Sequence, residues 1–353
     1  MDFKNYSLNI WSSKLNVLFH ICHPAHVHFF RNVINLLKKN TDHKVFIATR
    51  SKEITELLLK KYDLEFINLT TQKKGIIRLF FEFISQQYKI FWFIKKNKID
   101  IILSIGGAFN VHSAKLLGIK SWVFYDTEHA KLNNAITYRF ATKVFTPDCY
   151  ILEIGKNHIR YPGYHELAYL HPHWFEPNPK VLDDLDIKQN EVFFVLRFVS
   201  WEAAHDFGKK RLSFVDKLKL IDTLKSHGKV IISSEKPLPK EFEKYKMKLC
   251  PTKMHDLLYY ASLYIGEGGT MASEAAVLGT YSIYINELPT MGYIKEEIER
   301  YNLIFKSTNI DDIINHLQSM DLNKIITESK EKRKLIIQDK IDVTDYIYNQ
   351  IQN

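Results

Sequence analysis

The chain has 353 residues, of which 46% are hydrophobic and 25% are charged, a globular composition at a length that usually folds as two domains. Its formal net charge of +9 and isoelectric point of about 9.1 suit an anionic partner such as a nucleotide, an anionic lipid surface or nucleic acid. Its three cysteines, Cys22, Cys149 and Cys250, form no C-x-x-C pair, which argues against a disulfide framework or a zinc site and for a reducing compartment.

The first half of the chain alternates short apolar runs with amphipathic segments, as strands followed by helices do. Strands are predicted at residues 16–21, 44–48, 64–68, 100–104, 121–125 and 143–146. Helices are predicted at residues 26–38, at 51–61 with Ser51 as the N-cap, and at 74–96. Alternation of this kind predicts a parallel sheet with helices on both faces.

Prolines break the alternation between residues 162 and 179, after which the pattern starts again. Strands are predicted at 192–196, 229–233, 247–250, 263–265 and around 283, and helices at 212–225, at 254–260 and from about 310. We therefore predict an α/β protein of two Rossmann-like, doubly wound domains that face a central cleft. The predicted parts are an N-terminal domain at 1–165, a linker at 166–185, a C-terminal domain at 186–335, and a C-terminal helix at 336–353 that can pack back on the N-terminal domain.

The most informative motif follows the strand predicted at 263–265. Gly268 and Gly269 precede a short predicted helix, and glycines at a helix start let backbone N–H groups approach a phosphate closely. Thr270 lies in the first turn, and Glu274 lies one turn further on, within reach of the same ligand, for example a ribose. The alternative is a plain strand-to-helix turn with a helix cap. The predicted binding residues of this turn are Glu267, Gly268, Gly269, Thr270, Ser273 and Glu274.

Histidines follow the first predicted strand, in the run His23-Pro24-Ala25-His26-Val27-His28. A histidine at the start of a helix beside a cleft can act as a general base near neutral pH. We predict His26 as the base and His23 as a substrate contact, with capping of the turn as the alternative role. The H-x-x-H spacing has no carboxylate nearby and only the single Cys22, which pairs with no second cysteine, so we predict no metal here.

Two carboxylates, Asp126 and Glu128, follow the strand predicted at 121–125 and lie beside His129. Carboxylates at a strand end are candidates for acid–base chemistry, because one of them can keep the other protonated. The alternative is that Asp126 caps the following helix, a role that suits it better than Glu128.

The segment after the strand predicted at 192–196 carries Arg197, Ser200, Trp201 and His205. Arg197 and Ser200 suit a diphosphate, because arginine supplies charge-assisted donors. Trp201 suits stacking on a base or a sugar, and His205 is predicted as a further substrate contact. The alternative is an ordinary loop with a surface arginine.

The helix predicted at 74–96 has a narrow polar stripe and is otherwise apolar. The stripe comprises Lys74, Arg78, Glu82, Ser85, Gln86 and Lys89. Packing on the sheet needs only part of the apolar surface. The remainder, flanked by lysines at both ends, suits an anionic membrane face. The alternatives are burial against the sheet and a neighbour, or a dimer contact.

Together these residues resemble the GT-B glycosyltransferases and the related UDP-N-acetylglucosamine 2-epimerases. The glycine turn resembles both, and the segment from Asp126 through Asn134 to Arg139 is similar to the acidic motif of the epimerases and its following helix. The whole combination is most similar to an uncharacterised archaeal and bacterial family of that superfamily. Where epimerases carry an arginine after the first strand, this chain has His23-Pro24-Ala25-His26, which is more like the transferases.

The resemblance implies a nucleotide sugar held by the C-terminal domain, with Glu274 on the ribose and the glycine turn on the diphosphate. It requires neither a metal nor a bound cofactor, because the helix dipole and cationic side chains neutralise the leaving diphosphate. We therefore expect a glycosyltransferase acting on a polysaccharide or lipid-linked acceptor, with His26 as the base. The alternative enzyme is a nucleotide-sugar 2-epimerase, of the hydrolysing or the non-hydrolysing kind, with Glu128 as the base.

The net charge of +9 also suits a nucleic-acid-binding module, which would be a third class of function. The sequence has neither a recognition helix nor an aromatic-basic motif, so we expect no nucleic acid partner. Residues 1–13 lack the apolar core of a signal peptide, and no apolar run is long enough to span a bilayer. We expect a cytoplasmic protein, at the inner face of the plasma membrane if the helix at 74–96 contacts lipid.

Overall fold

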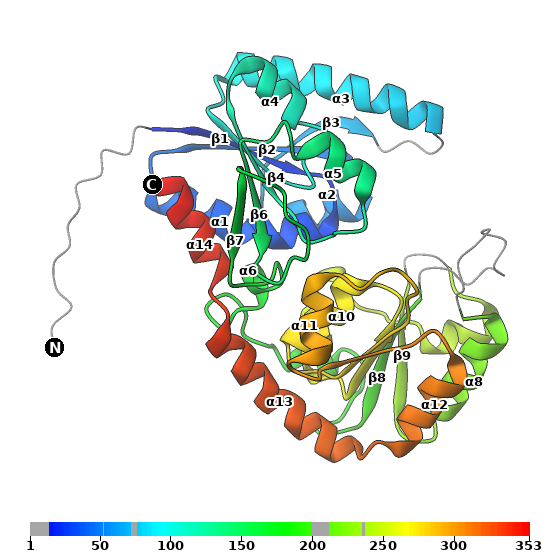
Figure 1. Cartoon of the computed structure of the whole chain (residues 1–353). Helices are drawn as coiled ribbons and strands as arrows, with labels where there is room; N and C mark the ends of the chain where they lie inside the picture. The colour runs from blue at the N-terminus through cyan, green and yellow to red at the C-terminus, as the bar shows by residue number, and fades with distance from the viewer. Residues whose placement is uncertain (1–13, 52, 72–75, 199–211, 235–236) are drawn as a thin grey trace, which may run out of the picture.

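Seven parallel strands form the first sheet, in the order β3-β2-β1-β4-β5-β6-β7 (Figure 1). The computed structural model describes residues 14–353 except 52, 72–75, 199–211 and 235–236. The strands are β1 (Asn16–Ile21), β2 (Lys44–Ser51), β3 (Ile67–Thr71), β4 (Ile101–Ile105), β5 (Lys120–Phe124), β6 (Lys143–Pro147) and β7 (His158–Tyr161). The helices between them are α1 (Pro24–Asn40), α2 (Glu53–Lys61), α3 (Ile76–Asn97), α4 (Val111–Leu117) and α5 (Lys131–Thr137).

The central strand β1 is buried on both faces because helices cover both faces of this sheet. Val17 and Phe19 belong to the same core cluster as α1, whereas Leu18 packs in a separate cluster with Ile90 of α3. Successive side chains of a strand point to opposite faces, so this run of buried residues places α1 and α3 on opposite sides of the sheet (Figure 1).

Five parallel strands form the second sheet, in the order β12-β11-β10-β8-β9. They are β8 (Phe193–Arg197), β9 (Lys229–Ser233), β10 (Leu263–Gly266), β11 (Ser282–Tyr284) and β12 (Ile304–Lys306). The helices that lead to and surround this sheet are α6 (Leu167–Leu170), α7 (Lys180–Asp183), α8 (Phe214–Leu224), α9 (Met254–Tyr260), α10 (Gly269–Val277), α11 (Gly292–Glu299) and α12 (Ile310–Ser319), with 3-10 turns at Lys240–Tyr245 and Pro251–Lys253. The prediction of an α/β fold with two such sheets is confirmed.

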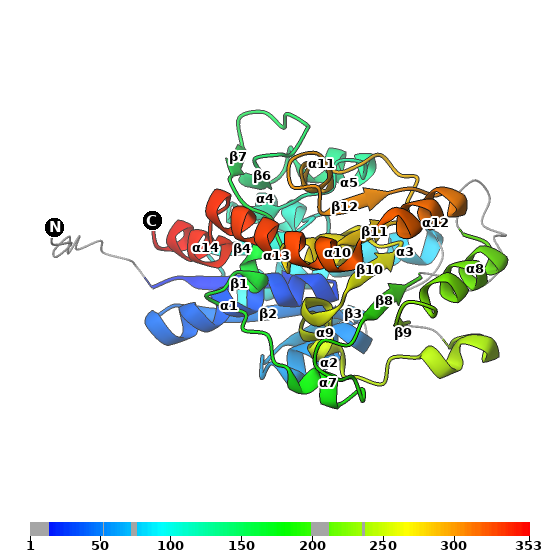
Figure 2. The same cartoon turned by 90° about the horizontal axis from the view of Figure 1, so that it is seen from below.

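The end of the chain returns to the N-terminal sheet. Helix α13 (Leu322–Asp339) runs along the C-terminal domain, and α14 (Val343–Gln352) then packs on α1 (Figures 1 and 2). The Thr344 hydroxyl donates to the Ala168 carbonyl at 2.6 Å. Between the two helices, the buried Lys340 ammonium lies 3.0 Å from a carboxylate oxygen of Asp148 and 2.8 Å from one of Glu296. This lysine therefore links carboxylates of both domains.

Several short elements differ from the prediction. The segment 247–250 is not a strand, because only Lys246 pairs with β9, as a single bridge to Ile232. Strand β3 begins at Ile67 rather than at residue 64. The Leu64 N–H instead donates a hydrogen bond to the Leu59 carbonyl at the end of α2. The sequence also gave no sign of β7, β12, α4 or α11, which have between three and eight residues and carry no sustained periodicity.

Helix α3 faces the sheet with polar side chains as well as with the predicted apolar ones, such as Ile90 and Ile94. The Glu82 carboxylate is 1% exposed and accepts from Arg50 Nη2 at 3.0 Å. The fully buried Gln86 amide lies 2.8 Å from His20 Nε2 and accepts from the Thr70 hydroxyl at 3.1 Å. The opposite face carries exposed apolar side chains, namely Phe81, Ile84, Tyr88 and Trp92.

Candidate active site

A cavity of about 140 Å³ lies where the two domains meet. Polar side chains from four segments line this cavity. Three of these segments directly follow a strand, namely β1, β5 or β10, and the fourth is at α6. Ligands of parallel sheets bind at such edges. The polar lining residues are His23 and His26 after β1, Asp126 and Thr127 after β5, His165, Glu166 and Tyr169 at α6, and Thr270 in α10. The structure thus brings together four predicted site residues, His23, His26, Asp126 and Thr270.

His26 lies in the first turn of α1, whose start is fixed by its neighbours. Pro24 occupies the start of the helix, where a missing N–H costs nothing, and His23 Nδ1 accepts the Ala25 N–H at 3.2 Å as the N-cap. His26 Nδ1 accepts the Cys22 N–H at 3.3 Å. Burial, assisted by His23 and other histidines, lowers the pKa of His26 well below its ordinary value. His26 is therefore neutral at physiological pH, and its proton is on Nε2.

Asp126 pairs with a histidine that the sequence did not point out. Its Oδ2 lies 3.1 Å from His165 Nδ1, and its Oδ1 accepts from the Thr127 hydroxyl at 2.8 Å. Burial acts to raise the pKa of Asp126, but the charge and hydrogen bond of His165 outweigh it, and the pKa falls below its ordinary value. His165 lies just after Pro162-Gly163, in a stretch predicted to end one domain, so nothing in the pattern marked it.

Glu166 is a second cavity residue that the sequence analysis missed. Its side chain is 2% exposed, and no other side chain among the described residues forms an ion pair or hydrogen bond with its carboxyl group. Burial and the negative charges of Glu297, Asp126 and Glu274 raise the pKa of Glu166 well above its ordinary value. This shift favours the protonated form of Glu166, which can donate a hydrogen bond in this cavity.

Glu128 does not line the cavity and instead joins the two domains. Its Oε1 accepts the N–H of Gly292 at 2.9 Å, at the start of α11, and the N–H of Ile151 at 3.2 Å. The backbones approach so closely that a Cβ on Gly292 would lie 2.0 Å from the Cys149 carbonyl oxygen. The role of Glu128 as a base stays a prediction, but its geometry is that of an interdomain contact.

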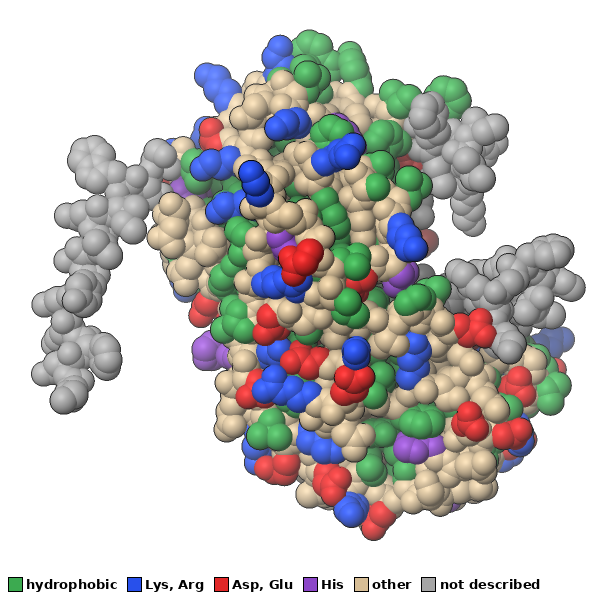
Figure 3. Space-filling model, in the orientation of Figure 1, with side chains coloured by type: hydrophobic (Ala, Val, Ile, Leu, Met, Phe, Trp, Pro, Cys, Tyr) green, Lys and Arg blue, Asp and Glu red, His purple; other side chains and the backbone are tan. Residues whose placement is uncertain are grey.

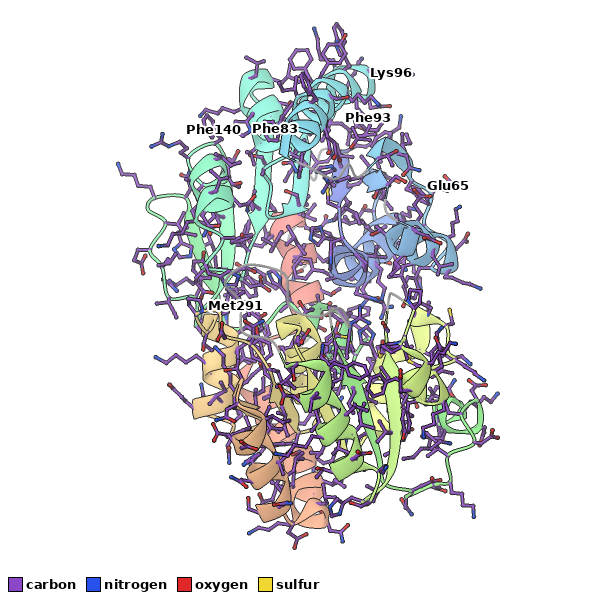
Figure 4. All side chains as sticks on the ribbon, turned by 90° about the vertical axis from the view of Figure 1, so that its right-hand side faces the viewer. Glu65, Phe83, Phe93, Lys96, Phe140 and Met291 are labelled. Atoms are coloured by element: carbon purple, nitrogen blue, oxygen red, sulfur yellow. The ribbon has the colours of Figure 1, made fainter. Side chains whose placement is uncertain are left out.

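The predicted glycine turn opens α10 at the cavity. Gly268 is the N-cap, Gly269 begins the helix, and Thr270 reaches the cavity wall. A Cβ on Gly269 would lie 2.8 Å from the terminal methyl carbon of Met291, which Figure 4 labels near the junction of the domains. The helix start thus presents unpaired N–H groups and a partial positive charge to this region, as an anion-binding turn does.

Glu274 and Ser273 are buried in the interface and do not line the cavity. Glu274 Oε1 accepts from the Tyr169 hydroxyl at 2.8 Å and lies 3.1 Å from His255 Nε2. The fully buried Ser273 hydroxyl donates to Glu297 Oε1 at 2.7 Å. A ribose contact at Glu274 would have to use its second carboxylate oxygen, Oε2, or displace Tyr169 or His255 from Oε1, and it stays a prediction.

Glu297 provides a test of this buried network through pH. Burial raises the pKa of Glu297 from 4.5 to about 8 in the folded protein. Between about pH 4.5 and pH 8, Glu297 ionises in the unfolded chain but stays protonated in the folded protein. The wild type therefore loses stability as the pH rises through this range. We expect Glu297→Gln to raise the free energy of unfolding at neutral pH by about 3 kcal/mol, and by nothing below about pH 4. Urea unfolding at several pH values measures this, and a difference between the two proteins that does not vary with pH would contradict it.

Arg197 ends β8, beside Gly266 of β10, and its Nη1 donates to the Ser233 hydroxyl at 2.9 Å. Glu267 is 6% exposed; its carboxylate lies 4.0 Å from Lys217 Nζ, and its N–H donates to the Arg197 carbonyl at 3.2 Å. Both residues thus lie at the carboxyl edge of the second sheet. The predicted contacts Ser200, Trp201 and His205 lie outside the described residues.

Two parallel α/β sheets with a polar cavity between them define a GT-B-type fold, as the resemblance implied. The chain belongs to the family described as "Protein of unknown function (DUF354)", whose model matches residues 15–353. A 28% identical relative is an uncharacterized protein of Methanocaldococcus jannaschii, aligned over 209 residues. The alignment covers 55% of this chain and 59% of that relative.

Solved structures share the fold at low sequence identity. A putative UDP-N-acetylglucosamine 2-epimerase of Listeria monocytogenes matches with a TM-score of 0.70 and 13% identity, over 96% of this chain and 95% of that one. The UDP-GlcNAc 2-epimerase of Neisseria meningitidis, bound to UDP-GlcNAc, matches with a TM-score of 0.67 and 12% identity, over 96% and 99%. The spinosyn forosaminyltransferase SpnP matches with a TM-score of 0.63 and 12% identity, over 97% and 100%. The family model thus confirms the expected membership of an uncharacterised family, and these structures confirm the fold that the resemblance implied.

Proposed function

We propose that the protein is a metal-independent glycosyltransferase that moves a sugar from a nucleotide-sugar donor to a hydroxyl group of a glycan or lipid-linked acceptor. The observation that carries the proposal is the meeting of the α10 N-terminus and of two histidines with an aspartate around one cavity. An anion-binding turn suits the leaving diphosphate, and a neutral histidine suits removal of the acceptor proton. The fold neighbours support the donor class, because two of them bear UDP-sugar names and one is named a transferase.

A nucleotide-sugar 2-epimerase is the second candidate, because the fold neighbours include several enzymes of that name. An epimerase must move a proton at C2 of the sugar, so it needs a base and an acid in one cavity. Glu128, the base predicted for this reaction, lies outside the cavity and is held by two backbone N–H groups. We therefore prefer the transferase.

Proton NMR in deuterated water separates the two enzymes. The purified protein is mixed with UDP-, GDP-, CMP- and dTDP-sugars in turn, without an acceptor. If the protein is a transferase, we expect saturation transfer from the protein to one of these nucleotide sugars and no deuterium at C2 of its sugar. Deuterium at C2 would establish the epimerase, and binding of none of these donors would overturn both candidates.

We also propose that α3 places the enzyme at an anionic membrane surface, on the cytoplasmic side. Its exposed face carries Phe81, Tyr88 and Trp92, which are 62%, 64% and 50% exposed, at helical spacing. Lysines follow in the last turn, where Lys95 Nζ lies 5.3 Å from the Trp92 ring centroid. In Figure 1, α3 lies along the edge of the N-terminal domain far from the C-terminal one, and Figure 3 shows basic and apolar side chains together at that end.

Aromatic side chains with adjacent lysines favour the headgroup region of an anionic bilayer. No described helix is long and apolar enough to cross a membrane, so the contact we propose is with the surface alone. Figure 4 places Phe83, Phe93 and Lys96 of α3 at the same end of the molecule, away from the interdomain junction marked by Met291. A lipid-linked acceptor in that membrane would then approach the enzyme from the side of the N-terminal domain.

Replacing Phe81, Tyr88 and Trp92 together by serine is expected to weaken binding to phosphatidylglycerol-containing vesicles by at least about tenfold, because three exposed aromatic groups no longer insert. Co-sedimentation with vesicles measures this. The matched control is Leu335→Ser, since Leu335 is 51% exposed on α13. Equal binding by the triple variant and the control would contradict a membrane role for α3.

A further inference from the structure

We propose that His165, oriented by Asp126, is the general base of the interdomain cavity and that His26 donates a hydrogen bond to the ligand there. This inference rests on the proposed glycosyl transfer and reverses the role that the sequence pattern favours for His26. It follows from where the hydrogen bonds of the two rings place their protons.

The contact between His165 and Asp126 leaves His165 Nε2 as the basic atom. His165 Nδ1 lies 3.1 Å from Asp126 Oδ2, and a lone pair directed at a carboxylate would be repelled, so Nδ1 carries the proton. Nε2 then has a free lone pair, and it is buried without a hydrogen-bond partner among the described residues. The Phe29 ring packs on this imidazole with centroids 4.6 Å apart, which restrains its plane. His165 also lines the cavity. An aspartate that holds a histidine in this tautomer is the orienting arrangement of a histidine base.

His26 has the opposite tautomer. A backbone N–H can only donate, so the bond from the Cys22 N–H at 3.3 Å uses the lone pair of His26 Nδ1. The neutral ring then carries its proton on Nε2 and has no second lone pair for an acceptor proton. A neutral imidazole of this kind serves as a hydrogen-bond donor to a developing negative charge.

The two histidines therefore divide one reaction between them. His165 Nε2 takes the proton of the acceptor hydroxyl, so an O–H bond breaks and an N–H bond forms. The acceptor oxygen bonds to the anomeric carbon of the sugar as the bond from that carbon to the nucleotide diphosphate breaks, and the diphosphate leaves with the electron pair. Asp126 stabilises the imidazolium formed at His165, and it acts as a positioning residue because it does not touch the reacting atoms.

Nitrogen-15 NMR of the imidazole rings tests the tautomers without any substrate. The wild type is expected to show His165 protonated on Nδ1 and His26 on Nε2 near neutral pH, with assignments from His165→Gln and His26→Gln. Asp126→Asn is expected to shift His165 toward the Nε2-protonated form, which a merely structural aspartate would not do. A wild type with His165 protonated on Nε2, or with His26 protonated on Nδ1, would overturn the inference.

The rate test uses transfer of the sugar to water from whichever UDP-sugar the wild type binds. His165→Ala is expected to slow UDP release by about 10²- to 10⁴-fold, with the dissociation constant of UDP itself unchanged, and Asp126→Asn to act in the same direction. The control is His227→Ala, since His227 is exposed and does not line the cavity. UDP release by His165→Ala within about threefold of the wild type would overturn the inference. If the wild type binds no nucleotide sugar, the proposed function fails, while the NMR result still decides the tautomers.

Discussion

Replacing His26 by alanine is expected to lower the rate of UDP release from a bound UDP-sugar by about 10²- to 10³-fold. The ring lines the cavity and is held by the Cys22 N–H, so its Nε2–H has a fixed direction. A fixed donor stabilises charge that develops during the reaction, and removing one such donor typically costs this much. Steady-state rates and UDP binding by calorimetry measure the effect, and UDP binding is expected to change by less than about threefold.

The control for this variant is again His227→Ala, which removes a histidine from the surface. His26→Gln adds a second comparison, because its side-chain amide retains an N–H donor but has no basic nitrogen. A donor role expects glutamine to recover part of the loss seen with alanine, whereas a base role expects none. A rate for His26→Ala close to that of the wild type would exclude either role for His26.

The sequence predicted the architecture well, because long periodic segments and buried parallel strands leave strong patterns. The run from Asn16 to Ile21 has the consecutive apolar residues Val17, Leu18 and Phe19, which point to both faces, and such a run indicates a central parallel strand. The glycine turn before α10 was predicted from the residue types that such a turn needs. Short edge strands such as β12 were missed because three residues carry no period.

The site was predicted only in part, because its geometry depends on contacts between distant segments. His26, Asp126 and Thr270 were found from their places after strands, and the structure brings them to one cavity. His165 and Glu166 were missed, because they lie in a stretch whose prolines indicate a linker. Nothing local distinguishes a histidine that meets an aspartate 39 residues earlier in the chain (165 − 126 = 39) from one on the surface.

In helix α3, too, the sequence predicted only in part which side chains are buried. The sequence predicted that apolar side chains of this helix pack on the sheet, and nothing in the pattern indicated that part of its polar stripe does so too. The second strand supplies Arg50 to neutralise Glu82, and the first supplies His20 to hydrogen-bond Gln86. A polar stripe can therefore face a sheet when the sheet provides partners, and the aromatic face is then left outside.

Replacing Glu128 by alanine is expected to lower the free energy of unfolding by about 1–3 kcal/mol. Its Oε1 is the acceptor for the N–H groups of Gly292 and Ile151, which come from different domains. The N–H of the buried Gly292 loses its acceptor at a cost of about 1–3 kcal/mol, whereas Ile151 is exposed and its N–H can bond to water. Urea unfolding measures the change, and proteolysis between the domains is expected to become faster as the interface opens.

Glu128→Gln separates this structural role from the base role predicted for an epimerase. The amide oxygen of glutamine can accept both N–H groups, so stability is expected within about 1 kcal/mol of the wild type. If Glu128 only joins the domains, UDP release falls by less than about tenfold; if it is a base, release falls by about 10²-fold or more at unchanged stability. The first result would assign catalysis to the residues that line the cavity. The second would return the base to Glu128, and the domains would then have to move apart for its carboxylate to reach a sugar, because the N-terminus of α11 holds it in the closed arrangement.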